Sequence, residues 1–159
     1  MLLKSFQALL LVAACAAPAS AQFDRAKDSL RDVKSNYEQA VRSAESNDRD
    51  GATRSLAEVT KALGAMIDAS RDVPSQLNDG ELSALGTKAK YFLEAAILFR
   101  NVTATLSEKV GRVGESYSSE LSTFKDKYGE FDRTYNDFNG SILRAAGALR
   151  RACPGCLNN

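Results

Sequence analysis

Histidine and tryptophan are absent from this sequence of 159 residues, and proline occurs only three times. Without histidine the chain lacks the commonest general base of enzymes and the commonest metal ligand of proteins. It also lacks a nucleophile elbow, a glycine loop that cradles phosphate and a metal-binding helix motif. We therefore expect no enzyme activity, no bound metal and no cofactor. Scarce proline favours long helices, because proline removes a backbone donor and clashes with the preceding turn.

An excess of one charge is also lacking, because 21 basic and 20 acidic residues alternate along the chain without forming blocks. Binding of nucleic acid requires a clustered basic face that displaces counterions. We therefore expect no nucleic acid partner. The same balance of charge removes any strong attraction to anionic lipid.

No apolar run is long enough to span a membrane, but the first residues are typical of an export signal. Lys4 supplies the positive start and Ala8–Ala17 the short apolar core. Ala19–Ala21 is a cleavage site of the A-x-A type, which leaves Gln22 as the mature N-terminus. We expect a secreted protein with a signal peptide over 1–21, a helical bundle domain over 22–152 and a tail over 153–159.

A second cleavage site competes with the first. Val12–Cys15 resembles a bacterial lipobox, in which Cys15 would be lipidated and would anchor the chain in the envelope. Pro18 followed by the A-x-A site favours ordinary secretion. The alternative is an envelope lipoprotein with a structural role.

Apolar residues recur at alternating steps of three and four in four segments, which predicts amphipathic helices with narrow coiled-coil-like seams. The first three seams are Phe23, Ala26, Leu30, Val33, Tyr37, Ala40 and Ala44; Ala52, Leu56, Val59, Leu63, Met66, Ser70 and Val73; and Leu82, Leu85, Ala89, Phe92, Ala96, Phe99, Val102, Leu106 and Val110. We expect an all-α, up-and-down bundle of about four long helices.

The fourth seam is the strictest and the richest in aromatic residues. It comprises Tyr117, Leu121, Phe124, Tyr128, Phe131, Tyr135, Phe138, Ile142, Ala145, Leu149 and Ala152. Aromatic side chains at this spacing predict a core, whose burial a chain without tryptophan needs. A groove for an apolar ligand between helices is the alternative.

Turn and cap signals separate the helices. Ser46–Gly51 predicts a turn, and Ser55 with Glu58 has capping-box spacing for the second helix, with a slightly earlier helix start as the alternative. Pro74 ends that helix at the preceding residue, and Asp79 is a candidate cap for the third.

Two glycines, Gly111 and Gly114, predict a break between the third and fourth helices. The apolar stripe runs almost in register across them. The alternative fold is therefore a helical hairpin followed by one long bent helix from Asp79 to Cys153.

The tail carries the segment Cys153-Pro154-Gly155-Cys156. Proline and glycine suit the central positions of a type II turn, which brings the two cysteines near the span of a disulfide. We expect a Cys153–Cys156 disulfide loop. A redox dithiol lacks a surrounding βαβ unit, and intermolecular disulfides are a further alternative.

Two glycosylation sequons start at Asn101 and Asn139. Both fall inside predicted helices beside seam residues, whereas acceptor sites usually lie on surface loops. They are candidate glycosylation sites in a eukaryote.

An exported four-helix chain that ends in Cys153-Pro154-Gly155-Cys156 resembles the cytochrome c-prime architecture, whose haem-attachment motif lies near the C-terminus. Leu157 stands where that family has its ligating histidine. The resemblance therefore implies the helical fold without histidine-ligated haem.

The chain also resembles the fungal hydrophobic surface-binding protein A family, through Asp32-Val33 in the first helix and a helix-turn-helix around Gly51. The resemblance covers most of 22–149 and implies adsorption to hydrophobic surfaces. The cysteine tail has no counterpart in it.

The leading functional hypothesis is a secreted, non-catalytic interaction protein of the surface-binding, effector or adhesin type. The second is a protein that adsorbs apolar ligands, lipid or hydrophobic surfaces by opening its bundle, as exchangeable apolipoproteins do. Composition and spacing do not identify a partner.

Overall fold

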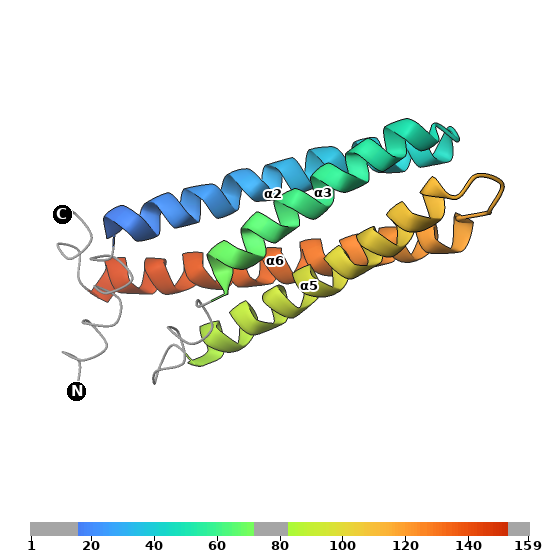
Figure 1. The fold of residues 1–159 in the computed structure, drawn as a ribbon. Helices are drawn as coiled ribbons and strands as arrows, with labels where there is room; N and C mark the ends of the chain where they lie inside the picture. Colours follow the sequence, from blue (N-terminus) through green and yellow to red (C-terminus); the bar gives the residue numbers. More distant parts are fainter. Residues whose placement is uncertain (1–15, 72–82, 153–159) are drawn as a thin grey trace.

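The computed structural model describes residues 16–71 and 83–152 and contains, in these ranges, four helices and no strand. The helices are α2 (Ala16–Glu45), α3 (Arg49–Ser70), α5 (Ser83–Gly111) and α6 (Ser118–Ala152). They pack along one another as a bundle, which confirms the all-α prediction (Figure 1).

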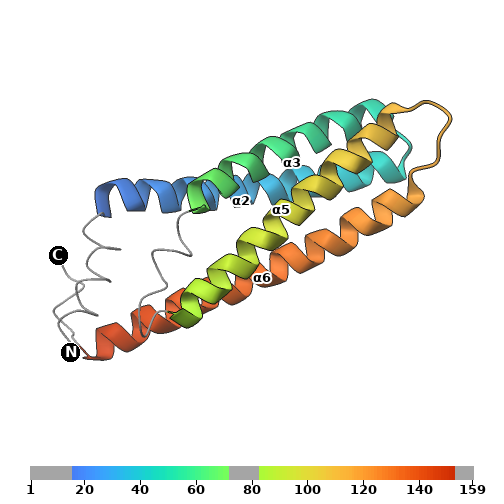
Figure 2. The same ribbon diagram turned by 60° about the horizontal axis from the view of Figure 1, so that its bottom comes forward.

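Two antiparallel hairpins make up the bundle. Helices α2 and α3 form one hairpin and helices α5 and α6 the other, and the two connecting turns lie at the same end (Figures 1 and 2). We call this end the turn end. Helix α3 packs along α5 and joins the hairpins, whereas α2 and α6 contact each other only sparingly.

The third and fourth helices are separate, so the alternative of one long bent helix is wrong. Helix α5 ends at Gly111 and α6 begins at Ser118. Between them Gly114 has a φ of 87°, a left-handed conformation that glycine adopts at little cost. The chain reverses there because the apolar face of α6 is buried only if α6 folds back along α5.

A Schellman motif ends α2 and places the start of α3. Asn47 has a φ of 59°, its N–H donates to the carbonyl of Ala44 (3.1 Å), and the N–H of Asp48 donates to the carbonyl of Ser43 (2.8 Å). Asp48 then caps α3, because its Oδ1 accepts from the N–H of Gly51 at 2.9 Å.

Ser55 and Glu58 therefore do not form a capping box, and the alternative of an earlier helix start is confirmed. Ser55 is buried inside α3, and Glu58 is exposed and pairs with Lys61 at 3.6 Å. The spacing of serine and glutamate matches the motif by coincidence, because the left-handed residue at Asn47 has already placed Asp48 at the cap.

Gly51 lies in the first turn of α3 and not in the connecting turn. A Cβ atom there would lie 2.8 Å from the Oγ of Ser43 and closer still to the carboxylate of Asp48. The glycine is thus required by the close approach of the two helix ends, a role different from the turn conformation predicted for it.

All four helices contribute to one core. The largest fully buried side chains are Phe99, Phe124, Phe131, Leu56, Leu63, Met66, Leu106, Val33, Val59, Val110 and Thr103. Thr103 is polar and does not belong to the predicted apolar seam of α5. Its hydroxyl donates to the carbonyl of Phe99 one turn earlier at 2.8 Å, so it enters the core without an unsatisfied polar atom.

The aromatic seam of α6 divides into two rows. The side chains of Tyr117, Phe124, Phe131 and Phe138 repeat every seven residues and are buried, whereas the alternate members Leu121, Tyr128 and Tyr135 are partly buried. A step of seven is almost two full turns of helix. The first row therefore faces the centre of the bundle and the second faces its edge.

Several predicted features lie outside the described residues: Pro74, Asp79, Cys15 and the cysteine loop Cys153–Cys156. Helix α2 begins at Ala16 and so includes the predicted cleavage site Ala19–Ala21. Among the four helices described, none has an apolar stretch long enough to cross a bilayer.

Candidate binding groove between α2 and α6

Helices α2 and α6 contact each other near the turn end. The rings of Tyr37 and Tyr128 stack with centroids 3.6 Å apart and an interplanar angle of 9°. An ion pair joins Lys125 to Glu45, and the Tyr117 hydroxyl donates to the carbonyl of Ala44 at 2.8 Å. Beyond these contacts the axes of the two helices separate toward the opposite end (Figures 1 and 2).

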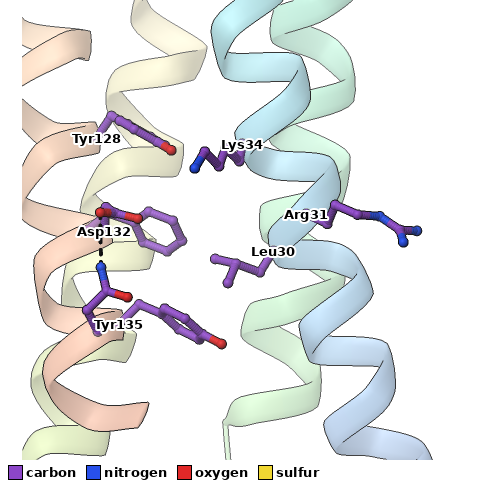
Figure 3. Close-up of a pocket in the computed structure, with 8 residues that line it drawn as sticks. Leu30, Arg31, Lys34, Tyr128, Asp132 and Tyr135 are labelled. Atoms are coloured by element: carbon purple, nitrogen blue, oxygen red, sulfur yellow. Dashed lines mark hydrogen bonds between the residues drawn. The ribbon is translucent and has the colours of Figure 1, made fainter. Parts of the chain in front are cut away.

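A groove of about 340 Å³ begins where these contacts end. Its volume lies at the lower end of the range of roughly 300–1,000 Å³ that small-molecule sites occupy. The residues that line it come only from α2 and α6 and comprise Leu30, Arg31, Lys34, Tyr128, Phe131, Asp132, Tyr135 and Asn136 (Figure 3).

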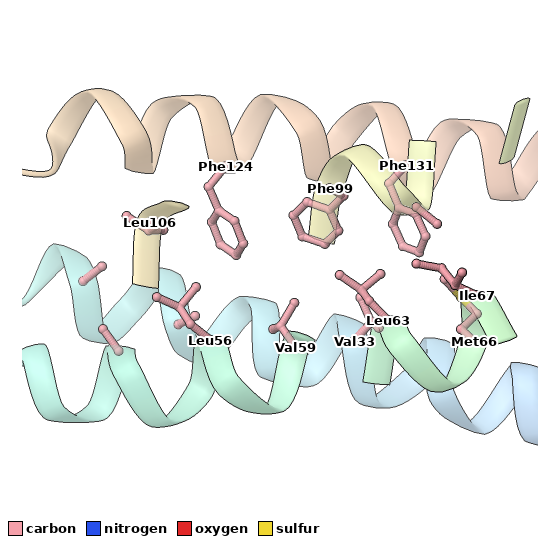
Figure 4. Close-up of a cluster of buried hydrophobic side chains, with 14 of the residues drawn as sticks. Val33, Leu56, Val59, Leu63, Met66, Ile67, Phe99, Leu106, Phe124 and Phe131 are labelled. Carbon is pink, nitrogen blue, oxygen red and sulfur yellow. The ribbon is translucent and has the colours of Figure 1, made fainter. Parts of the chain in front are cut away.

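The floor of the groove is apolar. Leu30 of α2 points toward the ring of Tyr135 of α6 (Figure 3). Phe131 also lines the groove, with only 1% of its surface exposed. Phe131 belongs to the buried cluster that includes Phe99 and Phe124 (Figure 4), and its ring centroid is 5.5 Å from that of Phe99. The groove thus borders the aromatic core at Phe131.

The rim of the groove is polar, with a basic α2 side and an acidic α6 side. Lys34 extends from α2 toward the hydroxyl of Tyr128, whereas Arg31 points away and pairs with Asp28 at 3.7 Å (Figure 3). Across the groove, Asp132 accepts a hydrogen bond from the side chain of Asn136 at 3.1 Å.

The tyrosine hydroxyls at this edge hold their protons strongly. Burial raises the pKa of Tyr128 to about 12, with a further contribution from the negative charge of Asp132. Burial also raises the pKa of Tyr135 and that of Tyr37. These hydroxyls are therefore neutral hydrogen-bond donors at physiological pH and not nucleophiles.

The spacing of the seams placed Leu30, Tyr128, Phe131 and Tyr135 on apolar faces, and the structure brings these four together at one edge. The charged rim was missed, although the sequence carries a signal for it. Lys34 stands four residues after Leu30 and three before Tyr37, and Asp132 holds the same position between Tyr128 and Tyr135. Each helix thus carries one charge within its apolar edge.

The described part of the chain offers little support for a metal site or for catalysis by carboxylates. Residues 16–71 and 83–152 contain no group of three or more side chains that could hold a metal ion. Among the acidic side chains of α6, Asp126 and Asp137 are exposed. A hydrogen bond from Lys127 (2.8 Å) lowers the pKa of Glu130, the direction opposite to that of a general acid.

The two sequons differ in their surroundings. Asn101 is exposed on α5, but the hydroxyl of Thr103 in the same sequon is fully buried and bonded to the backbone. Asn139 is partly buried on α6. Both lie within helices, so neither presents the surface loop on which acceptors usually lie.

The two hairpins are also joined at the turn end by Arg49, the first residue of α3. Its guanidinium donates to the carbonyls of Val110 (2.8 Å), Arg112 (2.8 Å) and Glu115 (2.7 Å). It also lies 4.9 Å from the centre of the Tyr117 ring. Arg49 therefore satisfies carbonyls at the end of α5 that a helix leaves without partners.

Comparison with family models, with curated proteins and with solved structures gives no match for this chain. The groove, its rim and the contacts at the turn end are therefore the observations on which a function can be argued.

Proposed function

We propose that this chain is an exported, non-catalytic interaction protein that binds an apolar partner at the α2–α6 edge of its bundle. The observation that carries the proposal is the groove, in which Leu30, Tyr128 and Tyr135 form an apolar lining that borders the aromatic core. A concave apolar site with a few convergent polar groups is the usual form of a ligand site.

The side chains of the groove support binding more than catalysis. The lining offers no histidine, cysteine or serine. Its tyrosines hold their protons, and its single carboxylate, Asp132, is hydrogen-bonded to Asn136 and partly exposed. The chain also lacks histidine altogether, so no residue of the groove is suited to move a proton near pH 7.

The proposal is tested with a neutral apolar fluorophore such as Nile red. We expect saturable binding by the purified chain and a loss of affinity of about tenfold in Leu30→Glu, because the substitution places a charge in the apolar lining. The control is Leu98→Glu, since Leu98 is an apolar residue of α5 that is already 40% exposed. Absence of saturable binding, or equal losses in the two variants, would contradict the proposal.

Adsorption to hydrophobic surfaces by opening of the bundle is the second candidate. It is favoured by the sparse contact between α2 and α6, because this edge of the bundle can part while the longer α3–α5 interface still joins the two hairpins. The test is incubation with polystyrene beads and with liposomes, followed by circular dichroism and limited proteolysis. Unchanged helix content and unchanged cleavage on both surfaces would remove this candidate.

Export is part of the proposal and has its own test. Mass spectrometry of the mature protein from its natural host should find Gln22 at the N-terminus. A lipidated Cys15 would instead establish the alternative of an anchored envelope lipoprotein. An N-terminus at Met1 would contradict both.

A further inference from the structure

We infer that the ligand of the α2–α6 groove is an amphipathic anion, an alkyl chain with a single negatively charged head, whose chain lies against Leu30 and Phe131 and whose head is held by Lys34. This inference rests on the proposed function and adds the chemical class of the ligand. It is argued from the positions of the apolar side chains, the free donors and the charges along the groove.

The apolar part of the groove suits a chain better than a compact ring system. The lining runs along the helices from Tyr128 past Phe131 to Tyr135 on one side, and Leu30 faces it from α2 (Figure 3). Successive seam residues on a helix are about 5–6 Å apart. The apolar strip therefore extends about 10 Å along α6, and it is bounded by the Tyr37–Tyr128 stack at the turn end.

Free hydrogen-bond donors lie at the turn end of this strip. Lys34 points toward the hydroxyl of Tyr128 (Figure 3). Among the side chains that the structure describes, none makes an ion pair or a hydrogen bond with Lys34 or Tyr128. Because the Tyr128 hydroxyl keeps its proton up to high pH, a negatively charged oxygen placed between the two would meet an ammonium group and a hydroxyl donor.

The charged side chains around the groove determine which head group the site prefers, and each can be changed by mutation. Arg31 points away from the groove and pairs with Asp28, so Lys34 is the cation that faces a ligand. Two carboxylates oppose an anionic head near the Tyr128 hydroxyl: Asp132, with one oxygen held by Asn136, and Glu38 of α2, whose charge also raises the pKa of Tyr128. Removal of the Lys34 charge and removal of the Asp132 charge should therefore change affinity in opposite directions.

The experiment compares three ligands with the same twelve-carbon chain and different heads: dodecanoate, dodecanol and dodecyltrimethylammonium. Each is titrated below its micelle concentration against the full chain with bound Nile red, and displacement is measured. Dodecanoate should bind tightest, by about three- to tenfold over dodecanol, the range expected for one partly exposed charge-assisted contact.

Matched variants identify the residues that select the head. Lys34→Gln should reduce the affinity for dodecanoate to that for dodecanol and leave dodecanol unchanged. Asp132→Asn should raise the affinity for dodecanoate about threefold. The control is Lys61→Gln on α3, because Lys61 is an exposed lysine whose partner is Glu58 and which does not line the groove. Circular dichroism verifies that each variant keeps its helix content.

The outcomes separate this inference from the proposed function. Equal displacement by the three heads, tightest binding of the ammonium, or an unchanged dodecanoate affinity in Lys34→Gln would overturn the head-group assignment while apolar binding at the groove stands. Failure of all three to displace the fluorophore, together with failure of the fluorophore itself to bind, would overturn both.

Discussion

Arg49 offers a test of how the two hairpins are held together at the turn end. Its guanidinium donates three hydrogen bonds to backbone carbonyls at and beyond the end of α5 and lies over the ring of Tyr117. The carbonyl of Val110 is partly buried, whereas those of Arg112 and Glu115 are exposed. The substitution to be made is Arg49→Met, which keeps the length of the side chain and removes its donors.

The expected loss of stability depends on which of the three carbonyls can bind water once the guanidinium is removed. The two exposed carbonyls bind water instead, so the loss of their hydrogen bonds changes the free energy of unfolding little. The bond to Val110 is charge-assisted and partly buried and should contribute about 1.5–3 kcal/mol. The contact with the Tyr117 ring adds about 0.5–1 kcal/mol. Arg49→Met should therefore lower the free energy of unfolding by about 2–4 kcal/mol, or the melting temperature by about 5–15 °C in a chain of this size.

Urea denaturation followed by far-ultraviolet circular dichroism measures this loss. Two further variants calibrate it. Arg54→Met changes an exposed arginine of the same helix and should alter stability by less than about 0.5 kcal/mol. Arg49→Lys keeps the charge but not the planar fork and should recover less than half of the loss. An Arg49→Met protein as stable as Arg54→Met would refute the reasoning, because it would show that the core alone holds the hairpins together.

The remaining predictions concern the core, the α2–α3 junction and the tyrosine edge. Phe131→Asp should destabilise the fold by several kcal/mol, because it places an unpaired charge where a 1% exposed ring now lies, and thermal unfolding equal to the parent's would contradict this. Gly51→Ala should cost about 1–3 kcal/mol through overlap with Asp48 and Ser43. Gly64→Ala, with no atom within 4 Å of its added Cβ, should instead stabilise by about 0.5–1 kcal/mol, and denaturant unfolding of the pair checks the contrast. The folded pKa of Tyr128 is raised to about 12, so its protonated form favours the native state. The stability that Tyr128 contributes is then fully present below pH 10 and falls as the pH rises from about 10 to 12. The pKa of Tyr37 and that of Tyr135 are also raised, so ultraviolet titration of Tyr128→Phe should show one late tyrosinate fewer than that of the parent.

The existence and type of the helices could be predicted because their signals are local. Alternating steps of three and four place apolar residues on one face whatever the partner is, and Phe124, Phe131, Leu56 and Val59 are all buried as a result. Helix α3 ends at Ser70, three residues before the end predicted from Pro74, and Pro74 itself lies outside the described residues.

The helix ends were less predictable because several residues compete for each cap. Ser55 and Glu58 have the spacing of a capping box, yet α3 begins six residues before Ser55. The left-handed conformation of Asn47 decides this, and it is stabilised by the Tyr117 hydroxyl, which lies 3.1 Å from the Oδ1 of Asn47. That contact comes from the second hairpin and so leaves no signal in the local sequence.

The amino-acid sequence by itself determined that this chain forms amphipathic helices with one aromatic face, because helical periodicity and burial depend on residues within two turns of each other. Only the tertiary structure decided that α2 and α6 are the pair left partly apart, and that Lys34 and Asp132 therefore lie across an open groove from each other. Which apolar edges meet depends on how four helices share one core, and that is a property of the whole packing and not of any single segment.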